Sequence, residues 1–88
     1  MVRGQVQGVG FRWWVRARAL ELGLVGHARN LDDGRVEVVA QGPPQSLSHL
    51  VTLLRQEPTS AGRPGVVESC TVEGPEPARA GVSGFAAC

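Results

Sequence analysis

Two glycines separated by one residue, Gly8 and Gly10, divide the start of the chain into two different patterns. A short apolar stretch that ends near Val6 precedes them, and a helical pattern runs from Phe11 to Leu24. Glycine tolerates backbone conformations that let successive N–H groups point into one concavity, and the first turn of a helix adds positive potential. The order of strand, glycine turn and helix therefore predicts a backbone site for an anion, with a simple tight connection as the alternative.

Arg12 stands directly after this turn. A guanidinium group carries a full positive charge in a planar fork that matches the oxygens of phosphate. Most arginines of a small domain lie on the surface without binding a ligand, and this is the alternative here. The position of Arg12 after the glycine turn favours phosphate as the anion.

The rest of the chain alternates between strand and helix patterns. Asp33-Gly34 is a strong hairpin signal, because the turn needs a positive φ. Apolar residues recur at helical spacing in each predicted helix. They are Phe11, Val15, Ala19 and Leu22 in the first helix and Leu47, Leu50, Val51 and Leu54 in the second. We predict strands at residues 1–6, 25–31, 35–41 and 66–73, helices at 11–24 and 44–57, and a short edge strand at 81–86.

This order of elements predicts an α+β fold. Strand, helix, strand, strand, helix and strand allow a four-stranded antiparallel sheet with two helices on one face. A chain of 88 residues is expected to form one domain, residues 1–88. The first strand is short, and we expect Met1 and Val2 to pair poorly because residues at a chain end fray.

Composition argues against several classes of function. The net charge of +1 does not suit a general nucleic-acid binder. RNA-binding modules of similar topology stack bases on sheet aromatics, and residues 35–41 contain none. Cys70 and Cys88 have no metal-ligand spacing, so we interpret them as free thiols in a reducing cytoplasm. No apolar run reaches the ~18 residues that a membrane span needs. We therefore predict a cytoplasmic monomer without metal, cofactor, nucleic-acid or membrane partner.

Three segments carry a specific combination of motifs and spacing. They are Val6-Gln7-Gly8-Val9-Gly10-Phe11-Arg12, Gly26-His27-Ala28-Arg29-Asn30 and Asp33-Gly34-Arg35-Val36-Glu37-Val38. Together they resemble the acylphosphatase family in its small, free-standing bacterial form. The resemblance runs from about Val2 to Gly42 and continues weakly to about Phe85.

The resemblance implies a ferredoxin-like βαββαβ sandwich and the metal-free hydrolysis of acyl phosphates, which are carboxylic–phosphoric mixed anhydrides. It implies that Arg12 holds the phosphate and that Asn30 orients the attacking water. From the residues alone, an asparagine before a hairpin is a turn-initiating residue. The phosphate cradle would be completed by the backbone amides of Gln7, Gly8, Val9, Gly10 and Phe11. Inorganic phosphate, the product, would inhibit the reaction.

Two further residues and one further function need an interpretation. His27 occupies a position that is often a bulky aromatic in the family, so we predict a packing role rather than a general base. Trp13 is predicted to be a partly exposed packing residue rather than a substrate platform. The hydrogenase-maturation carbamoyltransferases carry a similar N-terminal domain, so a carbamoyl-phosphate-handling or regulatory module is the alternative function. That domain usually has a proline-containing segment after the motif, where this chain has Trp13-Trp14, and this favours a free-standing enzyme.

Overall fold

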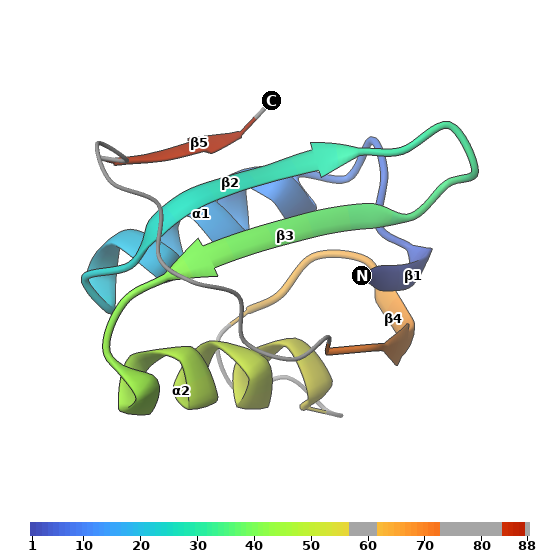
Figure 1. The fold of residues 1–88 in the computed structure, drawn as a ribbon. Coiled ribbons are helices and arrows are strands. Elements are labelled where there is room, and N and C mark those ends of the chain that lie inside the picture. The colour runs from blue at the N-terminus through green and yellow to red at the C-terminus, as the bar shows by residue number, and fades with distance from the viewer. Residues whose placement is uncertain (57–61, 73–83, 88) are drawn as a thin grey trace.

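The computed structural model describes residues 1–56, 62–72 and 84–87, which form two helices and five strands (Figure 1). In chain order they are β1 (Val2–Gln5), α1 (Phe11–Glu21), β2 (Val25–Asn30), β3 (Val36–Gln41), α2 (Pro44–Arg55), β4 (Val66–Cys70) and β5 (Phe85–Ala87). This confirms the predicted α+β order of elements. Three parts of the predicted elements lie outside the described residues. They are residue 57 of the second helix, residue 73 of the fourth strand and residues 81–83 of the edge strand. Neither described helix is long and apolar enough to cross a membrane.

The five strands form one mixed sheet in the order β4-β1-β3-β2-β5. β1 runs antiparallel to β3 and β4, β2 runs antiparallel to β3, and β5 runs parallel to β2. The prediction of a four-stranded antiparallel sheet is therefore corrected, because the short predicted edge strand joins the sheet as a fifth, parallel strand. Phe85 anchors β5 by burying its side chain in the core, and Arg16 Nε on α1 donates to the carbonyl oxygen of Phe85 at 3.0 Å.

Both helices share one hydrophobic core with one face of the sheet. In Figure 1, α1 lies behind β2 and β3. The buried core residues are Val2, Val6, Phe11, Val15, Ala19, Leu24, Ala28, Val36, Leu50, Leu54 and Phe85. The predicted helical stripes supply Phe11, Val15 and Ala19 from α1 and Leu50 and Leu54 from α2, because spacing of three and four residues places them on one side of a helix. Side chains alternate along a strand, so the residues between the buried ones face away from the helices.

α1 ends at Glu21, before the predicted Leu24. Gly23 has a φ of 72°, and the N–H of Leu24 turns back to the carbonyl oxygen of Ala19 at 2.9 Å. A left-handed glycine of this kind stops a helix, because it redirects the chain while satisfying a terminal carbonyl. Leu24 is then directed into the core, where it is buried, and the chain continues into β2.

β1 is paired from its first residue. Val2 pairs with Val36 of β3 and with Cys70 of β4, and the backbone of Met1 is hydrogen-bonded to that of Thr71. The expectation that Met1 and Val2 pair poorly is therefore wrong. The reason is the position of β1 inside the sheet, which gives it a neighbouring strand on each side.

Candidate active site

The segment between β1 and α1 turns at its two glycines. Gly8 has a φ of 72° and Gly10 a φ of 84°, and Gly10 is the N-cap residue of α1. A Cβ atom added at either position would meet nothing within 4 Å. Glycine is thus required here by the left-handed backbone and not by crowding. The same open space gives a ligand access to the backbone of the turn.

The backbone N–H groups of this turn are available to a ligand. The first helical hydrogen bond of α1 runs from the N–H of Trp14 to the carbonyl oxygen of Gly10 at 3.0 Å. The N–H groups from Gly8 to Phe11 have no partner within the described part of the chain, as is general for the start of a helix. The first turn of α1 also contains no acidic residue. These N–H groups and the helix dipole together form a site suited to an anion.

Arg12 lies in the first turn of α1, and its side chain is half-buried. Its guanidinium group has no hydrogen-bond or ion-pair partner among the described residues. Several other arginines are paired in the fold: Arg18 with Glu21, Arg29 with Glu37, and Arg35 with Asp33. An unpaired guanidinium on a residue in the first turn of this helix can provide the charge-assisted hydrogen bonds that phosphate accepts.

Asn30 is the last residue of β2 and pairs with Val36 at the start of β3. Its side chain is exposed. By strand alternation it lies on the same side of the sheet as the buried Ala28, which is the side that α1 covers. Asn30 therefore presents an amide group, with one acceptor and two donors, at the end of β2 on the side of α1.

The side chain of Gln7 connects the glycine turn to the hairpin that carries Asn30. Its Nε2 atom donates to the carbonyl oxygen of Leu31 at 2.7 Å and to that of Arg35 at 3.1 Å. Leu31 directly follows Asn30, so the turn and Asn30 are neighbours in the fold. From the sequence, only the backbone amide of Gln7 is predicted to take part in the site. No spacing in the sequence indicates these bonds, because their acceptors are backbone carbonyls 24 and 28 positions away.

The residue before β4 supports the turn from another side. Gly65 has a φ of 77°, and a Cβ atom there would clash with the carbonyl oxygen of Gln5 and lie 3.0 Å from Cγ2 of Val9. The close approach of these backbones therefore needs a glycine at this position. The turn is thus fixed between the start of β4 and the β2–β3 hairpin.

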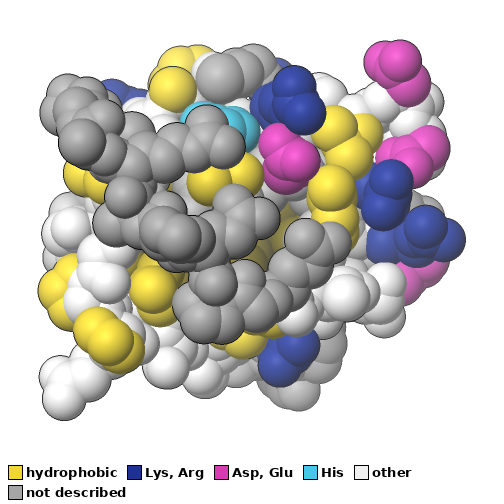
Figure 2. All heavy atoms as spheres, in the orientation of Figure 1, with side chains coloured by type: hydrophobic (Ala, Val, Ile, Leu, Met, Phe, Trp, Pro, Cys, Tyr) yellow, Lys and Arg dark blue, Asp and Glu magenta, His cyan; other side chains and the backbone are white. Residues whose placement is uncertain are grey.

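The opposite face of the sheet carries a separate charged cluster. Oε1 of Glu37 accepts a hydrogen bond from Arg29 Nε at 2.9 Å and lies 3.4 Å from His27 Nε2. Burial opposes the ionisation of Glu37, but its hydrogen bonds to His27 and Arg29 outweigh burial and lower the pKa of this carboxyl. In Figure 2, side chains of both charges gather over β2, β3 and the hairpin between them. His27 is therefore a member of this cluster, which the sequence did not predict, and it faces away from the side of Asn30. Its predicted packing role stays a prediction.

Trp13 lies on the exposed side of α1 and is not among the residues that pack against the core, so its predicted packing role stays a prediction. Its side chain is 60% exposed on α1. The guanidinium of Arg16 lies 5.8 Å from the centre of its ring, which is within the range of a cation–π contact. These two residues cover each other on the surface of the helix.

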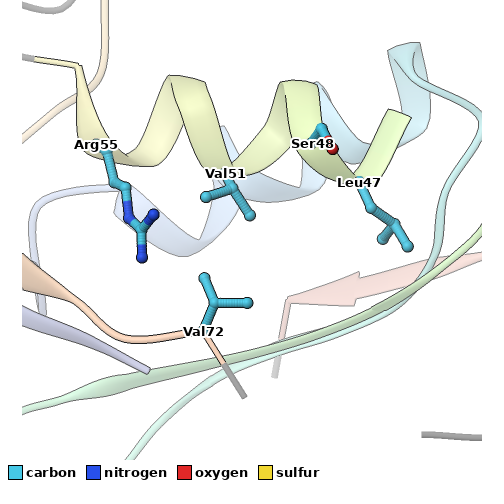
Figure 3. Close-up of a pocket in the computed structure, with 5 residues that line it drawn as sticks. All are labelled: Leu47, Ser48, Val51, Arg55 and Val72. Carbon is cyan, nitrogen blue, oxygen red and sulfur yellow. The ribbon is translucent and has the colours of Figure 1, made fainter. Parts of the chain in front are cut away.

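A shallow hollow lies between α2 and the segment after β4 (Figure 3). It is lined by Leu47, Ser48, Val51, Arg55 and Val72. Arg55 is already engaged there, because its Nη2 atom donates to the carbonyl oxygen of Cys70 at 3.0 Å. None of the predicted site residues lines this hollow. Elsewhere in the described ranges, no three His, Cys, Asp or Glu side chains come together as a metal site would need.

Comparison with known proteins places this chain in a family. A family model described as acylphosphatase matches residues 1–86. An acylphosphatase of Acidothermus cellulolyticus is 63% identical over 84 residues, covering 96% of this chain and 78% of that protein. One of Nocardia farcinica is 56% identical over 84 residues, covering 96% and 79%. The crystal structure of acylphosphatase from Bacillus subtilis matches with a TM-score of 0.80 at 32% identity, covering 99% of this chain and 91% of that one. These matches confirm the resemblance and the ferredoxin-like fold, and the chain belongs to the acylphosphatase family of hydrolases.

Proposed function

We propose that the chain hydrolyses acyl phosphates at the turn between β1 and α1. The phosphate group binds the backbone N–H groups of Gln7, Gly8, Val9, Gly10 and Phe11 together with the guanidinium group of Arg12, and Asn30 orients the attacking water. The observation that supports this assignment most is the pair of hydrogen bonds from the Gln7 side chain, which fastens the anion-binding turn to the residue after Asn30.

The chemistry suits a site without a strong base. An acyl phosphate is a mixed anhydride, so its hydrolysis expels a carboxylate, which is a good leaving group. The oxygen of water attacks phosphorus, the P–O bond to the acyl group breaks, and the proton of the water passes to phosphate or solvent. Phosphoryl transfer of this kind has a loose transition state, so positioning and charge stabilisation provide most of the rate enhancement.

Each proposed residue has a distinct part in this step. Arg12 and the turn N–H groups stabilise the negative charge on the phosphoryl oxygens. The side-chain oxygen of Asn30 accepts a hydrogen bond from water, and its NH2 group donates to a phosphoryl oxygen. This directs a lone pair of the water oxygen at phosphorus. Inorganic phosphate would occupy the same turn and inhibit competitively.

Hydrolysis of benzoyl phosphate by the wild-type chain, Arg12→Ala and Arg3→Ala tests the proposal. Arg3 is an exposed residue of β1, so its replacement removes the same charge outside the proposed site. We expect Arg12→Ala to lose about 3–4 kcal/mol of transition-state stabilisation, or a few hundredfold or more in rate, while Arg3→Ala stays near wild type. Near-normal turnover by a folded Arg12→Ala protein would contradict the proposed role of Arg12 in the hydrolysis. Measuring the hydrolysis of carbamoyl phosphate by the same three proteins tests the alternative function, a carbamoyl-phosphate-handling module.

A further inference from the structure

The side chain of Gln7 completes the hydrogen bonding of the two carbonyls that close the β2–β3 hairpin. The carbonyl oxygen of Leu31 already accepts from the N–H of Gly34 at 3.2 Å, and that of Arg35 accepts from the N–H of Leu31 at 2.8 Å. Each carbonyl oxygen has a second lone pair, and the NH2 group of Gln7 has two protons to donate. One amide group therefore engages both ends of the hairpin loop.

The backbone ladder provides little connection between these two segments. β1 pairs with β3 only through Val2 and Val36. Beyond Val2, the described pairing of β1 is with β4, on the opposite side of β1 from the hairpin. The part of β1 that leads into the glycine turn is consequently joined to the hairpin through the side chain of Gln7.

The residues that flank this link are those of the proposed site. Gly8 follows Gln7 and starts the anion-binding turn, and Leu31 follows Asn30. We propose that Gln7 is a positioning residue for the hydrolysis: its side chain sets the distance and orientation of Asn30 relative to the phosphate bound at the turn. This inference rests on the proposed function, since it assigns to Gln7 an effect that acts through Asn30.

Gln7→Met tests the inference because methionine has nearly the same length and volume but no proton to donate. The matched control is Gln5→Met, since Gln5 is an exposed residue of β1 just before the turn. We expect Gln7→Met to lower kcat about tenfold to a hundredfold, the cost of a small misplacement of a reacting group. Inhibition by inorganic phosphate should change by no more than about twofold, because the turn N–H groups and Arg12 remain. If the role of Gln7 were purely structural, Gln7→Met would lower the melting temperature, and it would not lower kcat selectively while leaving phosphate inhibition nearly unchanged.

A double-mutant cycle with Asn30→Ala shows whether Gln7 acts through Asn30. If it does, Gln7→Met should slow the wild-type chain but have little further effect in the Asn30→Ala chain, because the group it positions is gone. Fully additive losses in kcat would overturn the inference while leaving the proposed role of Asn30 intact. A wild-type rate for Asn30→Ala would instead contradict the proposed function itself, and the inference with it.

Gln7→Glu keeps the test decisive if the methionine variant does not fold. A glutamate has the shape of glutamine, but its carboxylate cannot donate to the carbonyls of Leu31 and Arg35, whereas its protonated form can donate one hydrogen bond. The kcat of Gln7→Glu relative to that of wild type should therefore rise as the pH falls. A ratio that stays constant with pH, or a variant as fast as wild type at neutral pH, would show that donation from residue 7 does not position Asn30.

Discussion

Met1 and Thr71 exchange two backbone hydrogen bonds. The terminal ammonium group of Met1 donates to the carbonyl oxygen of Thr71 at 3.0 Å, and the N–H of Thr71 donates to the carbonyl oxygen of Met1 at 2.9 Å. This pair extends the β1–β4 ladder beyond Val2 and Cys70. The first residue of the chain is thereby joined to the strand that supports the glycine turn.

We expect this pair to contribute to stability and not to turnover. Thr71→Pro removes the N–H that donates to Met1, and should lower the free energy of unfolding by about 1–2 kcal/mol in urea melts. Thr71→Ala is the control because it keeps that N–H. Equal stabilities of the two variants would show that the pair contributes nothing, and a lower kcat in folded Thr71→Pro would show that β1 pairing shapes the site.

Gly10→Ala is expected to weaken phosphate inhibition strongly, although its effect on stability should be modest. The left-handed backbone at Gly10 costs an L-residue roughly 1–2 kcal/mol, and relaxing it turns the N–H groups at the start of α1 away from the ligand. Gly34→Ala is the matched control, since Gly34 has a φ of 91° and equally open surroundings in the hairpin. Both variants should lose similar stability, but only Gly10→Ala should weaken phosphate inhibition strongly. Equal inhibition constants would contradict a ligand role for this turn.

Inorganic phosphate should raise the melting temperature, because it binds the folded turn and not the unfolded chain. At about ten times its dissociation constant, a ligand adds roughly 1.4 kcal/mol to the free energy of unfolding. Differential scanning fluorimetry with phosphate, and with sulfate at equal ionic strength, measures the shift. The shift should be absent in Arg12→Ala. A phosphate shift of equal size in that variant would place the anion elsewhere on the protein.

Turnover should persist in EDTA. The proposed step uses one guanidinium group, backbone amides and an asparagine, and none of these requires a divalent cation. The rate of benzoyl phosphate hydrolysis before and after dialysis against the chelator tests this. A loss that one added metal restores would replace the proposed mechanism with a metal-assisted one.

Glu37 should make the fold sensitive to acid. Its pKa is lowered in the folded chain, since the hydrogen bonds from His27 and Arg29 outweigh the effect of burial. Its contribution to stability is therefore fully present above the unfolded pKa of about 4.3, and is lost as the pH falls through the folded pKa. In urea melts, Glu37→Gln should be less stable than wild type at pH 7, and the difference should shrink below about pH 4. Glu68→Gln, at an exposed position of β4, controls for loss of one charge. A difference independent of pH would contradict this account.

Local chemistry in the sequence was enough to predict most of the elements and the glycine turn between β1 and α1, whereas anion binding at that turn stays a prediction. Gly34 has the positive φ that was predicted for the hairpin, and Gly8 and Gly10 form the predicted glycine turn with a left-handed backbone. The apolar stripe of α1 is buried at Phe11 and Val15. These features depend on the backbone freedom of one residue or on spacing within one element, which the sequence states directly. The assignment of Arg12 and Asn30 depends on their motifs, and their roles in catalysis stay predictions.

Only the tertiary structure decided which distant segments meet. Gln7 bonds the carbonyls of Leu31 and Arg35, Met1 pairs with Thr71, and β5 lies parallel to β2. In each case at least one partner is a backbone group, and backbone N–H and C=O groups are alike at almost every position of the chain. Sequence patterns therefore cannot select among them, and the choice is made by how the helices and strands pack around the common core.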